Sequence, residues 1–227
     1  MVEAKLPTHV AVIMDGNGRW AQKCGKTRNI GHIEGAKRVP LVVKHLFSRG
    51  VRVVTLYAFS EENFARPNEE VQGIFDRVAE FVEGFSETFG DVRLVFSGEL
   101  EAVSGRLCAA CRQAELTTRS NAPFTLNILL NYGGRSEIIR AARLFSCDSS
   151  SDADFRSGLY HPELPDPDLI IRTGGEKRLS GFMPYQSAYS ELYFSDVLFP
   201  DITTADLDAA LEDYLGRSRR FGGIKTP

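Results

Sequence analysis

An apolar run at residues 10–14 stops at Asp15-Gly-Asn-Gly-Arg19, five residues whose types suit a diphosphate bound through a metal ion. Glycine lets the backbone turn at positive φ and bring its N–H groups close to phosphate oxygens. Arg19 can bind those oxygens through two parallel hydrogen bonds, and Asp15 offers a hard oxygen ligand for Mg²⁺. A solvated turn between a strand and a helix would use the same residues, so this motif alone leaves both interpretations open.

Further anion-binding groups follow this motif closely. Arg28 and His32 lie just beyond it, and Gly31-His32 is predicted to open a helix whose first N–H groups favour a phosphate. His32 could instead only cap that helix. Its closeness in sequence to Arg19 and Arg28 favours a ligand site.

A hydroxyl, an amide and a guanidinium stand together at Ser60, Asn63 and Arg66. Pro67 comes next and should open the following helix. Ser60 and Asn63 could equally form the capping box of a helix start. That alternative leaves Arg66 unexplained, so a second group of ligand-binding side chains is predicted here.

Arg172 and Arg178 stand six residues apart around a Gly-Gly turn, and Ser180 follows them. This spacing predicts a clamp for a second diphosphate, in which each charged hydrogen bond contributes roughly 1.5–3 kcal/mol. A surface turn with solvated arginines is the alternative. Further along, Glu191 stands in an apolar context, where a carboxylate is costly unless it meets a cation. It could therefore complete a Mg²⁺ site with Asp15.

The elements that must position these groups follow from hydrophobic periodicity. Strands are predicted over 9–14, 51–58, 92–97, 124–130, 168–172 and 192–199, and helices over 32–48, 68–89, 99–120, 134–146 and 204–219. This alternation predicts an α/β fold, a single domain over 1–227 with a central, mostly parallel sheet of about six strands flanked by helices. Ligands bind such sheets beyond the carboxyl ends of the strands, where the unusual residues collect. Only 148–154 (DSSSDAD) is predicted to be a linker-like loop.

The composition excludes several classes of protein. A net charge of −3 over 227 residues gives no general attraction to nucleic acid or to an anionic membrane. No apolar run approaches the roughly 18 residues that span a bilayer, and the first residues lack the apolar core of a signal peptide. We therefore expect a cytoplasmic protein without a transmembrane segment. The four cysteines are predicted to be reduced thiols, since Cys108-Ala-Ala-Cys111 lacks a second pair of metal ligands.

Seven blocks of this sequence resemble, in order and over nearly the whole chain, the signature blocks of the cis-prenyltransferases, the undecaprenyl diphosphate synthase-like enzymes. They are MDGNGRWA, GHIEGA, TLYAFSEENFARP, LNYGGR, IRTGGEKRLS, YSELYF and RRFGG. The resemblance implies a homodimer, a hydrophobic tunnel beside the sheet, and Mg²⁺-dependent coupling of small isoprenoid diphosphates.

The same resemblance implies a role for each matching residue. Asp15 would act at the Mg²⁺-bound allylic diphosphate, and Glu191 would assist the metal. The first diphosphate would be held by Gly16, Asn17, Gly18, Arg19, Arg28 and His32, of which His32 would also be catalytic. Trp20 and Phe64 would be further substrate-binding residues. The reacting carbons and the proton-loss step would lie near Ser60, Asn63 and Arg66. The second diphosphate would be held by Arg172, Arg178 and Ser180. Residues 219–223 would reach toward the partner subunit's site.

Several positions depart from the usual family pattern. They are Phe64 and Ala65, Leu129 and Leu130, Ser136, Gly181, residues 183–185, and the phenylalanines at 75, 81, 85 and 89. Bulky side chains in a tunnel wall leave less room for a growing chain, which predicts a short product, although compensating core substitutions are the alternative.

Changes on the side of the second substrate give the chain a resemblance to the irregular-coupling branch of the family. This branch joins two dimethylallyl diphosphates head to middle, so the prediction is a ten-carbon lavandulyl-type diphosphate, with possible ring closure. The alternative is regular head-to-tail coupling of isopentenyl diphosphate to an allylic primer.

Two other classes of function fit less well. The segment from Gly18 to Gly25-Lys26-Thr27 encloses six residues where a nucleotide-binding P-loop requires four. A non-catalytic partner subunit of the same family would be expected to lose Asp15 or the arginine blocks, and both are present here.

Overall fold

Six parallel strands form the centre of the computed structural model, which describes residues 6–145 and 151–219. The strands are β1 (His9–Ile13), β2 (Val53–Ser60), β3 (Arg93–Ser97), β4 (Thr125–Tyr132), β5 (Leu169–Arg172) and β6 (Glu191–Phe194). They pair in the order β3-β4-β2-β1-β5-β6, and every pairing is parallel. The predicted α/β sheet of about six strands is therefore confirmed.

Helices connect these strands. The α-helices are α1 (Asn17–Lys23), α2 (Arg28–Ser48), α3 (Asn68–Glu83), α4 (Phe85–Phe89), α5 (Gly105–Thr118), α6 (Gly134–Leu144), α7 (Asp152–Arg156) and α8 (Thr204–Gly216). Short 3₁₀ helices are η1 (Glu61–Ala65), η2 (Leu100–Ala102) and η3 (Phe199–Asp201). None of the helices in the described ranges is long and apolar enough to cross a membrane.

Several details differ from the sequence prediction. The strand predicted over 192–199 ends at Phe194, and the helix predicted over 99–120 divides into η2 and α5. The pattern did not predict α1 or α7, because each is short and polar. The helix predicted over 68–89 divides at Gly84 into α3 and α4. The helix predicted to start at 32 begins four residues earlier, at Arg28. The loop predicted over 148–154 contains the start of α7, and its residues 148–150 lie outside the described ranges.

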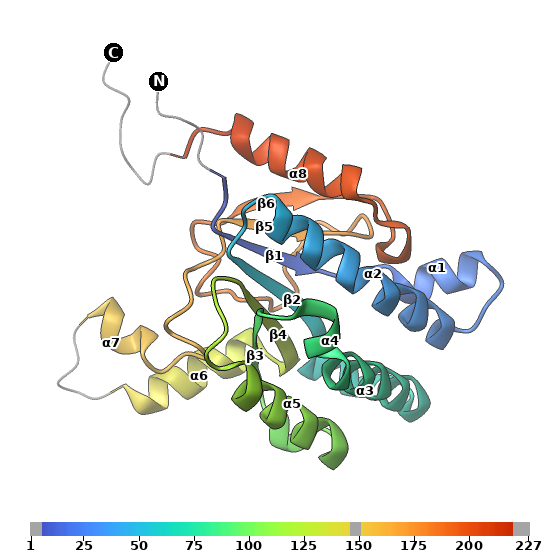
Figure 1. The fold of residues 1–227 in the computed structure, drawn as a ribbon, viewed down its shortest axis with the longest axis horizontal. Coiled ribbons are helices and arrows are strands. Elements are labelled where there is room, and N and C mark those ends of the chain that lie inside the picture. The colour runs from blue at the N-terminus through green and yellow to red at the C-terminus, as the bar shows by residue number, and fades with distance from the viewer. Residues whose placement is uncertain (1–5, 146–150, 220–227) are drawn as a thin grey trace.

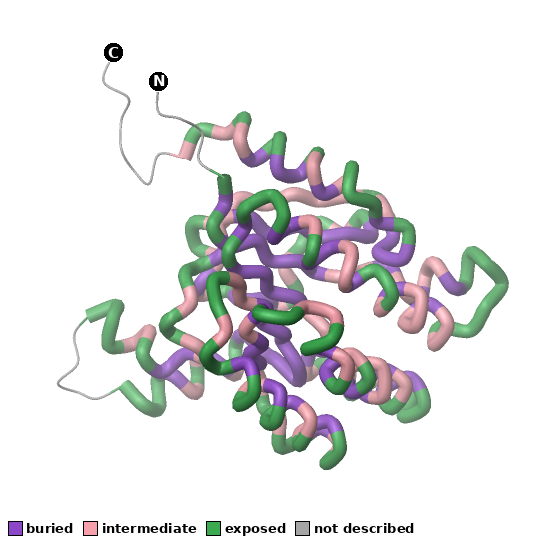
Figure 2. The backbone as a smooth tube through the Cα atoms, viewed as in Figure 1, coloured by how far each residue is buried: buried purple, intermediate pink, exposed green. Residues whose placement is uncertain are grey.

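The sheet is buried on both faces, which is why its strands read as continuous apolar runs. Along β1, Val10 and Val12 pack into the larger core, whereas Ala11 and Ile13 point to a smaller core on the opposite face. Contacts join α8 to α2, α2 to α3, and α3 to α5, so these helices form one layer over the larger core (Figure 1). In Figure 2 the most buried backbone follows the strands and the inner sides of these helices.

The strand order has a switch point at β1. The chain places β2 on one side of β1 and β5 on the other, so β1 and β5 pair although they lie far apart in the sequence. In open α/β sheets a crevice forms beyond the carboxyl ends of strands at such a point. Here those ends are Ile13 and Arg172, which are register partners.

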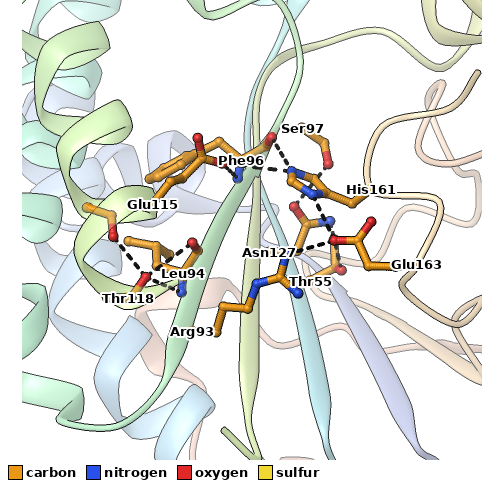
Figure 3. Close-up of polar contacts among 11 residues, drawn as sticks. Thr55, Arg93, Leu94, Phe96, Ser97, Glu115, Thr118, Asn127, His161 and Glu163 are labelled. Carbon is orange, nitrogen blue, oxygen red and sulfur yellow. Dashed lines mark hydrogen bonds and ion pairs between the residues drawn. The ribbon is translucent and has the colours of Figure 1, made fainter. Parts of the chain in front are cut away.

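The edge strand β3 is protected by side chains (Figure 3). Phe96 N–H donates to the Glu115 carboxylate at 2.9 Å, and the Phe96 carbonyl accepts from His161 Nε2 at 2.9 Å. Leu94 N–H donates to Thr118 Oγ1 at 3.0 Å. An unpaired strand edge can accept a further strand and so promote aggregation. Groups from α5 and from the segment before β5 therefore occupy the outward-facing polar groups of this edge.

A chain of hydrogen bonds crosses the sheet from β3 to β1. Ser97 donates to Asn127, the Asn127 amide donates to Thr55, and Thr55 Oγ1 lies 2.7 Å from His9 Nε2. His9 Nδ1 lies 2.7 Å from the Pro165 carbonyl, which can only accept. The proton of the neutral ring therefore lies on Nδ1, and complete burial lowers the pKa of His9 from 6.5 to about 4.

This burial predicts that the protein loses stability in mild acid. His9 stays neutral in the folded chain down to about pH 4, whereas it takes up a proton near pH 6.5 once unfolded. The unfolded state therefore binds more protons between these values, and stability falls as the pH falls through that window. Between pH 7.5 and 5 the contribution of His9 is about 2 kcal/mol. Urea unfolding at both pH values should show this loss in the free energy of unfolding. In His9→Gln the free energy of unfolding should fall less between the two pH values, by the contribution of His9. An equal pH dependence in both proteins would contradict it.

The pair Cys108 and Cys111 is divided between surface and core. Cys108 is partly exposed, while Cys111 is fully buried in α5 and burial raises the pKa of its thiol to about 12. A thiol of this kind is neither a good nucleophile nor a ready metal ligand.

Candidate active site

A cavity of about 380 Å³ lies beyond the carboxyl ends of β1, β2 and β5. It is lined by Ile13, Met14, Asp15, Gly16, Asn17, Gly18, Arg19, Arg28, His32, Tyr57, Ala58, Phe59, Ser60, Asn63, Arg66, Arg172, Arg178 and Ser180. Three of the predicted groups, those of the DGNGR motif, of residues 60–66 and of residues 172–180, thus converge on one space. The loop at residues 131–135, which includes the end of β4 and the start of α6, does not line it.

Asp15 lies at the centre of the charged groups. Its carboxylate is 2.9 Å from Arg172 Nη2 and 3.0 Å from Arg19 Nη2. Burial opposes ionisation of this carboxyl, but the hydrogen bonds from Arg172 and Arg19 hold the pKa of Asp15 below its ordinary value. Asp15 is therefore ionised at neutral pH and fixes two guanidinium groups at the crevice between β1 and β5.

Arg172 connects Asp15 to the loop that carries the other predicted clamp residues. It is buried at 4% exposure, and its Nη1 donates to Ser180 Oγ at 3.0 Å and to the Arg178 carbonyl. Arg178 differs, since its side chain is 60% exposed and pairs with Glu176. The predicted diphosphate clamp therefore has one buried side chain, Arg172, and one exposed side chain, Arg178.

Gly174 allows this loop to approach the first motif. Its φ is +87°, and a Cβ there would lie 2.6 Å from Arg19 Nη2 and 3.1 Å from the Asp15 carbonyl group. A side chain would therefore be strained and would also push the two loops apart. The GG turn in the sequence reflects this close approach.

The helix α1 is held against α2 by a second close contact. A Cβ on Gly31 would lie 1.9 Å from the Asn17 carbonyl oxygen, so only glycine lets the two helices meet here. This contact fixes Arg28 and His32, one helical turn apart on α2, beside the DGNGR motif. The prediction that Gly31-His32 opens the helix is wrong, because α2 begins at Arg28 with Thr27 as its N-cap.

His32 does not cap a helix. Its Nε2 lies 3.0 Å from Glu70 Oε1, and its side chain lines the cavity. Burial lowers the pKa of His32, and the Glu70 carboxylate opposes this only in part. The imidazole is therefore mainly neutral at pH 7 and can either donate or accept a proton.

Ser60 and Asn63 form the capping box that the sequence left as an alternative. The Ser60 N–H donates to Asn63 Oδ1 at 3.2 Å at the start of η1. Both side chains also line the cavity together with Arg66. The cap therefore positions them at the cavity wall, and the two interpretations are compatible.

An apolar cavity of about 90 Å³ continues from the charged one between α2 and α3. Four residues line both spaces: Met14, Asn17, His32 and Ala58. Its remaining wall is mainly aliphatic and includes Phe81, which packs against Phe85 and Phe89, themselves stacked with ring centroids 4.9 Å apart. This is the place of the predicted hydrophobic tunnel.

Two residues that were predicted to bind substrate, Trp20 and Phe64, lie outside the cavity lining. Trp20 donates its indole N–H to Asp201 at 2.7 Å and so fixes α1 to η3, outside the cavity lining. Phe64 is 43% exposed and packs edge-on against Phe59 at 5.0 Å, also outside the lining.

Within this chain Glu191 does not meet Asp15. It is the register partner of Leu169, at the opposite end of β5 from Arg172. Three residues, or about 10 Å of strand, separate those ends. The cation that Glu191 meets is Arg217, at 2.8 Å.

The charged cavity offers few protein ligands to a metal ion. Within the described ranges no cluster of three or more His, Cys, Asp or Glu side chains is placed to hold one. Mg²⁺ is commonly bound by one or two carboxylates together with substrate phosphates and water. The partly exposed Asp15 carboxylate, set among arginines, fits a Mg²⁺ ion that a diphosphate brings with it.

Sequence reasoning missed two carboxylates in this region. Glu70 bonds Arg28, His32 and Arg66, while Glu176 pairs with Arg178 and lies 3.7 Å from Arg19. Nothing in the local pattern distinguishes Glu70 from an ordinary glutamate in the first turn of a helix. Only the folded arrangement shows that it meets cavity residues.

Comparisons with known proteins agree with this geometry. Residues 13–222 match the family model described as putative undecaprenyl diphosphate synthase. An isoprenyl transferase of Fusobacterium nucleatum is 42% identical, over 99% of both chains, and one of Thermotoga maritima is 42% identical, over 97% of this chain and 98% of that protein.

Two solved structures are also similar. Lavandulyl diphosphate synthase from Lavandula x intermedia, in complex with dimethylallyl diphosphate, has a TM-score of 0.89 at 31% identity and covers 96% of this chain and 98% of its own. A probable undecaprenyl diphosphate synthase from Campylobacter jejuni has a TM-score of 0.81 at 30% identity, with 96% and 99% covered.

Proposed function

The chain belongs to the undecaprenyl diphosphate synthase-like cis-prenyltransferases and is a prenyl transferase, and from this premise we propose that it couples isopentenyl diphosphate to an allylic diphosphate head to tail and makes a short product. The observation that carries this proposal is the junction of two cavities. A space lined by arginines opens at Met14, Asn17, His32 and Ala58 into an apolar pocket. This arrangement fits a molecule with a diphosphate head and a hydrocarbon tail.

The proposed roles follow the geometry. The allylic diphosphate lies against the DGNGR turn, Arg28 and His32, since His32 belongs to both cavities and the tail can enter the apolar one. The second diphosphate lies against Arg172, Arg178 and Ser180. This places the two substrates side by side with their reacting carbons between the two sets of cations. Such positioning contributes roughly 7–11 kcal/mol to catalysis.

The reaction breaks the allylic C1–O bond and releases a diphosphate. The alkene of isopentenyl diphosphate forms a new bond to C1, and a proton leaves the adjacent carbon to create the next double bond. Bound Mg²⁺, held by Asp15 and the diphosphate, would neutralise charge on the leaving group. Arg19, Arg28 and the aimed N–H groups stabilise the same growing charge, which lowers the barrier more than it strengthens substrate binding. Ser60, Asn63 and Arg66 line the same cavity, and the proton-loss step is assigned to them in this proposal.

The relatives favour regular coupling over the irregular coupling that the sequence pattern suggested. The curated relatives at 42% identity, matched over nearly the whole chain, are named isoprenyl transferases. The similar lavandulyl diphosphate synthase structure is less identical, at 31%. The departures at residues 65, 181 and 183–185 are therefore attributed to local packing. Gly181, for example, accepts the Gly134 N–H at 3.1 Å.

A product assay tests this proposal directly. Purified protein with Mg²⁺ is supplied with dimethylallyl diphosphate alone, with dimethylallyl and isopentenyl diphosphates, and with longer allylic primers plus isopentenyl diphosphate. We expect head-to-tail cis products only where isopentenyl diphosphate is present. A ten-carbon branched or cyclic alcohol from dimethylallyl diphosphate alone would overturn the regular reaction and favour the irregular one.

A second prediction concerns the length of the product. The apolar cavity of about 90 Å³ is small beside ordinary ligand pockets of roughly 300 Å³ or more, and Phe81 is a bulky residue of its wall. Phe81→Ala should open the space toward Phe85 and lengthen the main product by at least one isoprene unit, as mass spectrometry would show. Phe145→Ala, an exposed phenylalanine at the end of α6 that does not line this cavity, is the control. An unchanged product in the Phe81 variant would show that another wall limits the chain.

The homodimer is proposed from the family resemblance alone, as is the cytoplasmic location. In the described part of the C-terminal segment Arg219 pairs with Asp168 at 2.6 Å. Residues 220–223, predicted to reach toward the partner subunit's site, lie outside the described ranges.

A further inference from the structure

A buried carboxylate joins two guanidinium groups and an imidazole that line the charged cavity. Glu70, in the first turn of α3, accepts from Arg28 Nε at 2.9 Å and from Arg66 Nη1 at 3.2 Å, and lies 3.0 Å from His32 Nε2. Its side chain is only 7% exposed. We propose that Glu70 is a positioning residue that holds Arg28, His32 and Arg66 in the arrangement that binds the allylic diphosphate. This inference rests on the proposed function of that site.

The geometry exceeds what a helix start requires. A glutamate in the first turn of a helix interacts with the helix dipole and is typically solvated, with a contribution of 0.3–1 kcal/mol. Glu69, the preceding residue, is exposed in this way. Glu70 instead points inward and forms hydrogen bonds with groups from α2 and from the end of η1. One carboxylate thus connects three segments that meet only in the folded chain.

The electrostatics support the same role. Arg28 and Arg66 converge on one region beside His32, where their like charges repel. Burial lowers the pKa of both His32 and Arg66, and Arg28 lowers each further. Glu70 is the counter-charge in each case, and its own pKa stays below the ordinary value: burial opposes ionisation, but Arg28 and His32 outweigh it. Without this carboxylate the long arginine side chains would have no common anchor, and a diphosphate would have to order them on binding.

Positioning and simple charge repulsion predict opposite signs for removal of the carboxylate. A negative charge beside an anion site weakens anion binding, so a residue that only contributed charge would, when neutralised, let diphosphate bind more tightly. A residue that orders the binding groups would, when neutralised, make diphosphate bind more weakly. The sign of the change therefore distinguishes the two roles.

The variants are Glu70→Gln, which keeps the shape and removes the charge, Glu70→Asp, which keeps the charge on a shorter side chain, and Glu69→Gln as the matched control. Calorimetry measures the binding of inorganic diphosphate with Mg²⁺. We expect about tenfold weaker binding in Glu70→Gln, the lower end of the range for supporting residues of a binding site. Glu70→Asp should fall between the parent and Glu70→Gln, and Glu69→Gln should match the parent.

Two further measurements separate positioning from general destabilisation. NMR titration of the His32 ring should show a lower pKa in Glu70→Gln, because Glu70 is the group that raises it. Kinetics should show a higher KM for the allylic substrate and little change in KM for isopentenyl diphosphate. If Glu70→Gln does not fold, Glu70→Asp provides the test: weaker diphosphate binding than in the parent supports positioning, and tighter binding contradicts it.

Unchanged or tighter diphosphate binding in a folded Glu70 variant would overturn the positioning role while leaving the proposed function intact. The positioning role would also be overturned if the parent makes prenyl products and Glu70→Gln has the same KM for the allylic substrate as the parent. A parent protein that binds no diphosphate and makes no product would overturn the proposed function, whatever the His32 titration shows.

Discussion

Replacing Asp15 with alanine should leave a folded protein whose turnover is at least roughly 100-fold lower, the scale of losing one electrostatic catalytic contact. The structure gives this carboxylate two tasks. It holds Arg172 and Arg19 at 2.9 and 3.0 Å, and it is the hard oxygen ligand in the charged cavity that a Mg²⁺ ion would use. The side chain is 29% exposed, so its removal leaves no large buried void.

The measurement is steady-state turnover over a Mg²⁺ titration, with circular dichroism as the check on folding. Asp91→Ala, an exposed aspartate next to β3, serves as the matched control and should behave as the parent. Asp15→Asn keeps the shape without the charge and should be nearly as impaired as the alanine variant. Turnover within a few-fold of the parent, with the same Mg²⁺ requirement, would remove Asp15 from the metal site.

Replacing Arg172 with alanine should raise the KM for isopentenyl diphosphate and cost roughly 2–4 kcal/mol in kcat/KM. Arg172 is 4% exposed and bonds Asp15, Ser180 and the Arg178 carbonyl, so its loss leaves Asp15 with Arg19 as its remaining arginine partner and the clamp loop unanchored. A lysine ammonium group cannot replace the hydrogen bonds that the planar guanidinium donates in several fixed directions. Arg172→Lys should therefore recover only part of the lost kcat/KM.

Arg178→Ala provides the comparison within the same clamp. The Arg178 side chain is 60% exposed, so its interaction is screened by water and its removal should raise the same KM by a smaller factor. Initial rates are measured with each substrate varied in turn. If either variant changed only the kinetics of the allylic substrate, the assignment of this clamp to the second diphosphate would be wrong.

The sheet could be predicted from the sequence because its signal is local. β-branched apolar runs such as VRVVTLYA indicate strands wherever they stand, and all six predicted strands overlap observed ones. The helix α1 could not be predicted, because its seven residues include a glycine and carry no apolar stripe. It is held instead by the packing of Asn17 on Gly31 and by the bond from Trp20 to Asp201.

The site residues divide in the same way: some are revealed by a local sequence pattern and others only by the folded structure. The DGNGR turn, Arg66 and Arg172 could be named from residue types because each stands at or shortly after the carboxyl end of a strand, where loops of a parallel sheet converge. The contacts of Glu70 with Arg28 and of Trp20 with Asp201 could not be predicted, because the partners lie 42 and 181 residues apart in the sequence. Glu191 was paired with Asp15 by chemistry alone, and the strand register separates them within one chain.

The pairing of β1 with β5 also constrains how the chain folds during synthesis. Val10 meets Leu169, so the middle of the sheet closes between residues that are made far apart in time. At roughly 5–20 residues per second, the ribosome presents β1 and β2 well before β5 exists. Until then one side of β1 has no strand partner, and Asp15 has no Arg172. The charged cavity is therefore among the last parts of the molecule to form, and a nascent chain shorter than about 170 residues carries an open strand edge that chaperones must shield.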